Sequence, residues 1–182
     1  PVTLKMRLGW DIDSINAPMI AKSAEETGVQ MITIHARTRN QFFKGKPDWK
    51  SVKAVKDVVS IPIIINGDII DTKSATEALQ QSNADGIMVG RGAIGKPWLL
   101  KELSKSLYCN SEKNMGCEVQ LYKLVILHLS LILSHYGRVT GLKMFRKHLV
   151  KYLSILRLKP NDQYRFMTEE SIERLKRMIR HN

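Results

Sequence analysis

Residues 30–37, QMITIHAR, and residues 61–68, IPIIINGD, decide the fold of this chain. Each is a short apolar run that ends in polar residues, a pattern typical of a buried strand. We expect strands at 2–7, 30–35, 61–65 and 86–89, and the stretches between and after them have helical patterns at 17–27, 49–58, 72–81 and 97–107. Strands this apolar, alternating with helices, predict a parallel sheet buried on both faces, as in a barrel or a doubly wound fold.

The alternation of strands and helices stops after residue 107. A polar stretch at 109–116 leads into three helical patterns, at 118–136, 141–156 and 169–180. We therefore expect an α/β domain at 1–108, a linker at 109–117 and a small all-α domain at 118–182.

Length and composition exclude several classes of protein. The chain has 182 residues, of which 43% are hydrophobic and 25% charged, so it is neither disordered nor fibrous. The two cysteines, Cys109 and Cys117, form no metal-ligand spacing and no disulfide framework, which fits a reducing cytoplasm and predicts no metal site. The longest apolar run, 124–133, is too short to span a membrane, so no membrane partner is expected. Pro1 stands directly before strand-like sequence, as expected of a truncated start.

The charge is strongly basic and unevenly distributed. Lys and Arg number 29 against 17 acidic residues, a net charge of +12, which makes a nucleic acid the first candidate partner and a generally basic surface the alternative. Residues 1–100 carry +3 and residues 101–182 carry +9. Lys143, Lys147 and Lys151 share one helix face that could follow a phosphate backbone, although such a face is also typical of a merely solvated helix.

The carboxyl ends of all four predicted strands are polar. They are Lys5-Met6-Arg7, His35-Ala36-Arg37, Asn66-Gly67-Asp68 and Gly90-Arg91-Gly92. Parallel strands place these ends on one rim, where α/β proteins bind ligands. Residues 90–92, shortly before a helix, could bind a phosphate with backbone N–H groups and a guanidinium. Lys5 and His35 could then face the reactive ring of a phosphate-bearing cofactor, although each of them alone would more often be structural.

The loop at 36–48 interleaves basic and aromatic side chains beside that rim. It contains Arg37, Arg39, Lys44 and Lys46 together with Phe42 and Phe43. Stacking combined with phosphate contacts is how proteins hold an extruded base. The alternative is that one phenylalanine closes the top of the fold.

These stretches together resemble the flavin-dependent tRNA-dihydrouridine synthase family, and most nearly its bacterial B-type branch. The resemblance is carried by PVTLKMRLGWD, ITIHARTRNQFFKGKPDW, IPIIINGDI and DGIMVGRGAIGKPWLL, which cover nearly all of residues 1–100. Beyond them, FRKH at 145–148 is similar to a basic helix of the family's C-terminal tRNA-binding domain.

The resemblance implies the C-terminal half of a TIM barrel, four βα units, followed by the small all-α domain. It also implies an FMN cofactor, NADPH as reductant, and reduction of uridine to 5,6-dihydrouridine in tRNA. By motif match, the cofactor would be bound by Lys5 and His35 at the flavin ring and by Asn66, Gly67, Asp68, Gly90 and Arg91 at the phosphate. The residues expected to contact RNA are Arg37, Arg39, Lys143, Arg146, Lys147 and His148.

The family's catalytic residue has no counterpart in this sequence. In the family, a cysteine in an Asn-x-Gly-Cys-Pro motif upstream of the segment matching 2–7 gives a proton to the uracil ring, and these 182 residues contain no such motif. We therefore expect the chain to be inactive alone and to need an N-terminal half, which could be separately encoded. The alternatives are a non-catalytic tRNA-binding remnant and another flavin-dependent barrel enzyme, which the basic helical tail disfavours.

Overall fold

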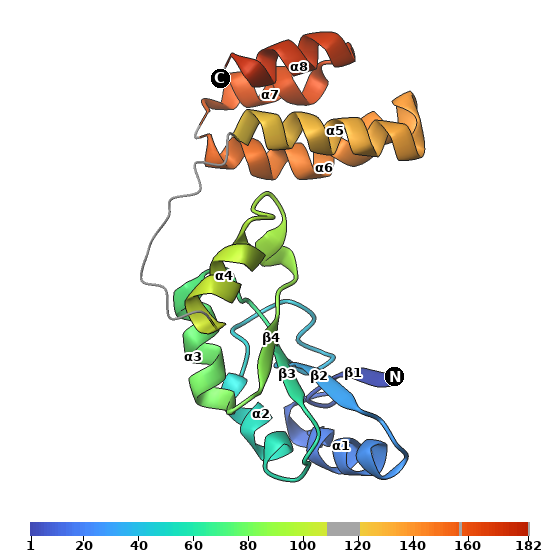
Figure 1. Ribbon diagram of the computed structural model, residues 1–182, viewed down its shortest axis with the longest axis vertical. Coiled ribbons are helices and arrows are strands. Elements are labelled where there is room, and N and C mark those ends of the chain that lie inside the picture. The colour runs from blue at the N-terminus through green and yellow to red at the C-terminus, as the bar shows by residue number, and fades with distance from the viewer. Residues whose placement is uncertain (109–120, 157, 182) are drawn as a thin grey trace. The chain divides into compact units, whose positions relative to one another are not determined.

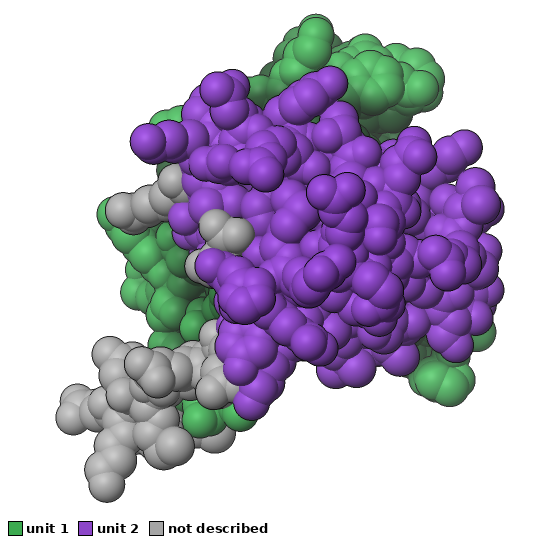
Figure 2. All heavy atoms as spheres, turned by 90° about the horizontal axis from the view of Figure 1, so that it is seen from above, with its two compact units in different colours: residues 1–93, 97–112 green, residues 94–96, 113–182 purple. Residues whose placement is uncertain are grey.

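The computed structural model describes residues 1–108, 121–156 and 158–181. The chain divides into two compact units, which Figure 2 distinguishes by colour: unit 1 comprises residues 1–93 and 97–112, and unit 2 comprises residues 94–96 and 113–182. The predicted linker, with Cys109 and Cys117, lies outside the described residues.

Unit 1 consists of four βα repeats (Figure 1). The strands are β1 (Thr3–Arg7), β2 (Met31–His35), β3 (Ile63–Asn66) and β4 (Gly86–Met88). The helices that follow them are α1 (Ala17–Glu26), α2 (Trp49–Lys56), α3 (Thr72–Ser82) and α4 (Leu99–Tyr108), with short 3-10 turns η1 (Ile12–Ser14) and η2 (Arg91–Ala93). All neighbours are parallel and the sheet order is β1-β2-β3-β4. This sequential order is that of a barrel, because a doubly wound sheet reverses its strand order. The fold class expected from the sequence, half a TIM barrel followed by helices, is confirmed.

One face of the sheet forms the core of unit 1. Ile32 and Ile34 of β2 and Ile63 and Ile65 of β3 are completely buried. They belong to one cluster with small and branched residues of the helices, namely Ala17, Ala21, Val52, Val55, Ala75, Ala78, Leu99 and Leu103. Because side chains alternate along a strand, the opposite face carries the intervening residues, many of them polar. The sheet was expected to be buried on both faces; one face is apolar and buried, and the other is more polar but also buries Thr33 and His35.

The described residues of unit 2 form four helices: α5 (Leu121–Tyr136), α6 (Arg138–Ile155), α7 (Pro160–Thr168) and α8 (Ile172–Arg180). Their core includes Val125, Leu129, Phe145, Leu149, Leu153, Phe166 and Leu175. Gly141 of α6 lies so close to α5 that an added Cβ would be 3.1 Å from the Ile132 carbonyl oxygen. A larger residue there would push the two helices apart.

Two helices of unit 2 begin at other residues than predicted, and a third was not predicted. The helix expected at 141–156 spans Arg138–Ile155. The expected helix at 169–180 begins at Ile172, because the Ser171 side chain caps it by accepting a hydrogen bond from the Arg174 N–H. Helix α7 was not predicted, although Pro160 at its start is a recognised helix-start signal.

Among the described residues, no helix is long and apolar enough to cross a membrane. In the same described part, no group of three or more His, Cys, Asp and Glu side chains could hold a metal ion.

Candidate functional site

The strand register brings the predicted polar residues into rows across the sheet. Arg7 pairs with His35, His35 with Asn66, and Asn66 with Met88, so these residues form one row at the carboxyl ends of the strands. Lys5, paired with Thr33, lies one row deeper on the same face. We call this face, with Lys5, Arg7, His35 and Asn66, together with residues 67–68 and 90–91 that follow β3 and β4, the polar rim.

Asn66 connects the rim to its neighbouring strands. Its side-chain Nδ2 donates to the Met88 carbonyl of β4 at 2.8 Å, and Lys5 Nζ lies 3.4 Å from its Oδ1. Burial, with a smaller contribution from the Arg7 charge, lowers the pKa of Lys5. The Lys5 ammonium is therefore a stronger proton and hydrogen-bond donor than an ordinary lysine.

His35 is held as a neutral ring. Its residue surface is only 7% exposed, and burial, reinforced by Arg7, Lys5 and Arg37, lowers its pKa to about 4 against an opposing contribution from Asp68. At neutral pH the imidazole is therefore a hydrogen-bonding group and not a cation. The positive charge of this rim comes from Lys5 and the arginines.

Arg37, expected to contact RNA, is instead a buried structural cation. Its side chain is 1% exposed. Nη2 pairs with Asp68 Oδ2 at 2.5 Å and Nη1 donates to Asp68 Oδ1 at 3.2 Å, while Nη2 and Nε donate to the Gly45 and Lys44 carbonyls at 2.6 and 3.2 Å. Arg37 thus fixes its own loop to the end of β3 and has no surface left for a partner.

Asp68 joins Arg37 to Arg91. Its Oδ1 accepts from Arg91 Nη2 at 2.8 Å, and the hydrogen bond from Arg37, opposed by burial, is the largest influence that lowers its pKa. The residue also adopts a left-handed backbone, with φ of 48°. Because an ionised carboxylate repels a phosphate, this geometry suits Asp68 to orienting Arg91 and not to binding an anion itself.

The two glycines of the rim differ in the space around them: a side chain at Gly67 would meet neighbouring atoms, and one at Gly90 would not. Gly67 has φ of 135°, and an added Cβ would lie 3.0 Å from Pro47 Cβ and 3.3 Å from His35 Cδ2. An added Cβ at Gly90 would have no described heavy atom within 4 Å. Beside Gly90, the Arg91 side chain is 56% exposed. Gly90 and Arg91 therefore border accessible space, as a phosphate site requires.

Phe43 lies over the cations of this rim. The Arg91 and Arg7 guanidinium carbons are 4.5 and 5.7 Å from the centroid of its ring, and the His35 ring is 6.2 Å away. Phe43 is itself 58% exposed. The aromatic loop expected beside the rim is therefore in contact with it.

The RNA-contact residues expected in unit 2 fall into two groups. Lys143 and Lys147 are exposed. Arg146 is half-buried and donates to the Glu169 carbonyl at 3.2 Å, and half-buried His148 packs its ring 4.7 Å from that of His128. The first two are open to a partner, while the other two also hold helices together.

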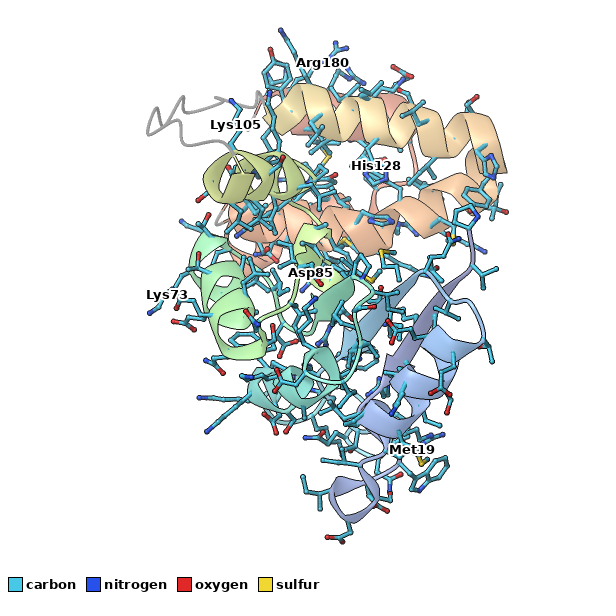
Figure 3. The ribbon with its side chains drawn as sticks, turned by 60° about the horizontal axis from the view of Figure 1, so that its bottom comes forward. Met19, Lys73, Asp85, Lys105, His128 and Arg180 are labelled. Carbon is cyan, nitrogen blue, oxygen red and sulfur yellow. The ribbon has the colours of Figure 1, made fainter. Side chains whose placement is uncertain are left out.

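His128 on α5 points toward α6 (Figure 3). Its Nδ1 lies 3.0 Å from the hydroxyl of Tyr152 on α6. Burial, with a contribution from His148, lowers the pKa of His128. This histidine is thus a contact between helices.

Residues 121–156 contain no acidic side chain but carry six lysines and arginines. The cations of α5 and α6 therefore have no carboxylate on these two helices to neutralise them. Such a surface favours an anionic partner.

Sequence reasoning did not single out Arg7 or Trp10 as candidate contacts. Arg7 Nη1 donates to the Thr38 and Phe42 carbonyls at 2.8 and 2.9 Å. The available signal was that Arg7 ends the strand predicted at 2–7 and that Trp10 follows three residues later.

Comparison with known proteins gives a consistent result. The family model "Dihydrouridine synthase (Dus)" matches residues 1–180. The chain is 50% identical over 154 residues to a probable tRNA-dihydrouridine synthase of Rickettsia conorii, an alignment that covers 85% of this chain and 46% of that protein. It is 50% identical over 152 residues to a protein of the same name from Rhodobacter capsulatus, covering 84% and 47%.

A relative of a named branch also matches. Identity to tRNA-dihydrouridine synthase B of Pasteurella multocida is 42% over 170 residues, covering 91% of this chain and 49% of that protein. The chain spans about half the length of the curated relatives it matches.

Proposed function

Because this chain belongs to the dihydrouridine synthase family, we propose that it provides half of an enzyme that reduces uridine to 5,6-dihydrouridine in tRNA. Its share is the C-terminal part of the cofactor site together with an RNA-binding helical unit. The observation that carries the proposal is the polar rim of a chain that matches this family over 1–180. Lys5, His35 and Asn66 lie there on one face of β1, β2 and β3, and Arg91 follows β4 in η2. The substrate would place the protein in the cytoplasm.

The residues of the rim fit FMN. Accessible space beside Gly90 and the half-exposed guanidinium of Arg91 suit its phosphate. Lys5 would supply a cation that stabilises negative charge on the flavin ring of FMN. His35, which is neutral, would supply a hydrogen bond. When bound, FMN would carry reducing equivalents from NADPH to the C5–C6 bond of uridine.

Asp68 and Arg37 prepare this site without touching the cofactor. The Arg37–Asp68 pair fixes the carboxylate that holds Arg91. A guanidinium held in place before the ligand arrives loses less conformational entropy on binding. In the proposed site, Asp68 is therefore an orienting residue, in place of the phosphate ligand that the family resemblance implied.

The proton donor must come from outside these 182 residues. Loss of a general acid costs about 10²- to 10⁴-fold in rate. We propose that activity needs the remaining strands of the barrel and the family's cysteine, whether they lie on the same polypeptide or on another.

The helical unit supports a second candidate function, binding of tRNA without catalysis. It rests on the six basic and no acidic side chains of residues 121–156. The two functions differ in their need for flavin. Binding of tRNA that is sensitive to salt but indifferent to FMN, with no dihydrouridine formed, would favour the second.

The decisive experiment mixes this chain with the N-terminal half of a family member and titrates FMN by its visible absorbance. We expect a yellow complex that converts uridine in tRNA in the presence of NADPH, detected as a mass gain of two hydrogens. Arg91→Ala should weaken FMN binding about 10- to 100-fold, the usual loss for a charged hydrogen bond.

A matched control is Arg138→Ala, which removes an exposed arginine from unit 2. It should leave FMN affinity unchanged. Equal FMN affinity in Arg91→Ala and the unchanged chain would show that the phosphate is bound elsewhere.

A further inference from the structure

An exposed stack of three side chains stands on the loops that follow β1 and β2. The guanidinium carbon of Arg39 lies 5.0 Å from the centroid of the Trp10 ring and 4.6 Å from that of Phe42. Trp10 is 59% exposed and Phe42 52% exposed. A planar cation thus lies against two large aromatic rings that are mostly in solvent.

Backbone hydrogen bonds hold the two loops together. The Arg39 N–H donates to the Gly9 carbonyl and the Asn40 N–H to the Trp10 carbonyl, both at 2.9 Å. Arg7 adds its bond to the Phe42 carbonyl. The stack is therefore positioned by the fold and does not depend on the rotamers of free surface side chains alone.

The backbone at Phe42 is strained. Its φ of 49° lies in the left-handed region, which costs a residue with a Cβ about 1–2 kcal/mol. Burial does not compensate for this, because half of the Phe42 surface faces water. Strained conformations of this kind are retained where the geometry serves a site.

The charges around the stack favour an anionic ligand. Arg7, Lys44 and Lys46 lie on the same two segments as Arg39. The nearest acidic residues in sequence are Asp11 and Asp13, and Asp11 is occupied as the cap of η1, where it accepts from the Asp13 N–H and the Ser14 hydroxyl. Among the ion pairs of the described residues, none involves Arg39, so its N–H edges are open to a ligand.

We propose that Trp10, Arg39 and Phe42 form a stacking platform for an unpaired nucleotide of RNA. Every base presents a π-face to aromatic and guanidinium planes, and the N–H groups of Arg39 can reach the adjoining phosphate. A paired base cannot stack here, because both its faces are covered within the helix. The identity of the ligand as RNA rests on the proposed function, while the place and mode of binding rest on the stack itself.

The test is binding of two RNA probes to the full 182-residue chain, a single-stranded oligouridylate and a fully paired, blunt-ended duplex of equal length. Stacking is worth about 1–3 kcal/mol per base, so Trp10→Ala should weaken oligouridylate binding about 5- to 150-fold. It should change duplex binding less than twofold.

Two further variants separate stacking from charge and from folding. Trp10→Phe keeps a ring and should retain most of the affinity. Arg39→Lys keeps the positive charge but removes the planar guanidinium. It should therefore weaken oligouridylate binding without changing how that binding depends on salt concentration. Met19→Ala, which shortens another exposed apolar side chain of unit 1 (Figure 3), is the matched control and should bind like the unchanged chain.

Unchanged oligouridylate affinity in both Trp10→Ala and Arg39→Lys would overturn the platform. An equal loss for both probes would also overturn it. A selective loss of single-strand binding supports the platform even if the reconstituted barrel forms no dihydrouridine, and that second result would overturn only the proposed function.

Discussion

Replacing Arg37 by methionine should destabilise unit 1, because Arg37 is a buried clamp: its guanidinium joins its own loop to Asp68. Methionine keeps an unbranched stem of similar reach but removes the guanidinium that binds Asp68 and two loop carbonyls. Breaking one partner out of a buried ion pair costs about 3–5 kcal/mol, and each carbonyl that loses a donor adds about 1 kcal/mol.

The solvent around Asp68 reduces this cost. Its side chain is 38% exposed and keeps the Arg91 partner at 2.8 Å, so water and that second cation compensate part of the loss. The expected loss in the free energy of unfolding is about 3 kcal/mol. For a urea slope of about 1–3 kcal/mol per molar, the midpoint should fall by roughly 1–3 M.

Urea unfolding followed by tryptophan fluorescence suits this measurement. All three tryptophans, Trp10, Trp49 and Trp98, lie in unit 1, so the signal reports that unit alone. Arg91→Met is the matched control, because it removes the other arginine that pairs with Asp68. The Arg91 side chain is 56% exposed, so its loss should lower the free energy of unfolding by only about 0–1 kcal/mol.

A double-mutant cycle isolates the pair. If Asp68 is the main partner, the double variant Arg37→Met, Asp68→Asn should be less destabilised than the sum of the single variants, by about 1–3 kcal/mol. A loss below about 0.5 kcal/mol for Arg37→Met, or strictly additive single effects, would refute the account of Arg37 as a buried clamp.

Gly92→Ala should destabilise unit 1, because a Cβ there would overlap a backbone carbonyl oxygen. Gly90→Ala meets open space and should leave the stability of unit 1 within about 0.5 kcal/mol of the unchanged chain. Urea unfolding of both variants measures the difference. His35 binds a proton only near pH 4 when folded and near pH 6.5 when unfolded, so the free energy of unfolding should fall by up to about 3 kcal/mol as the pH is lowered through this range. Most of that pH dependence should be absent from His35→Gln, and an unaltered pH profile would contradict the buried neutral imidazole. Lys143→Glu combined with Lys147→Glu should weaken tRNA binding and reduce its salt dependence, and an unchanged affinity in a filter-binding assay would make this face merely solvated.

The order of strands and helices in unit 1 was predictable from the sequence. Runs such as IPIIINGD end in polar residues, and such local patterns predict a parallel strand and the position of its carboxyl end. The same signal predicted one rim for Lys5, His35, Asn66 and Arg91. The register places the first three on one face of the sheet, and Arg91 follows β4 in η2. In unit 2, by contrast, α7 was not predicted, because its sequence is short and largely polar and buries one residue, Phe166.

The sequence by itself determined the family, the α/β half-barrel and the rim to which its polar residues belong, because these depend on local periodicity and on motifs along the chain. Only the tertiary structure decided what individual charges do. Arg37 and Arg39 are two residues apart and equally basic, yet the first is buried against Asp68 and the second lies exposed against Trp10. The partners that make this difference, Asp68 for Arg37 and Trp10 for Arg39, lie 31 and 29 positions away in sequence. The local sequence of the loop at 36–48 does not predict such distant contacts, because they depend on how the strands pair.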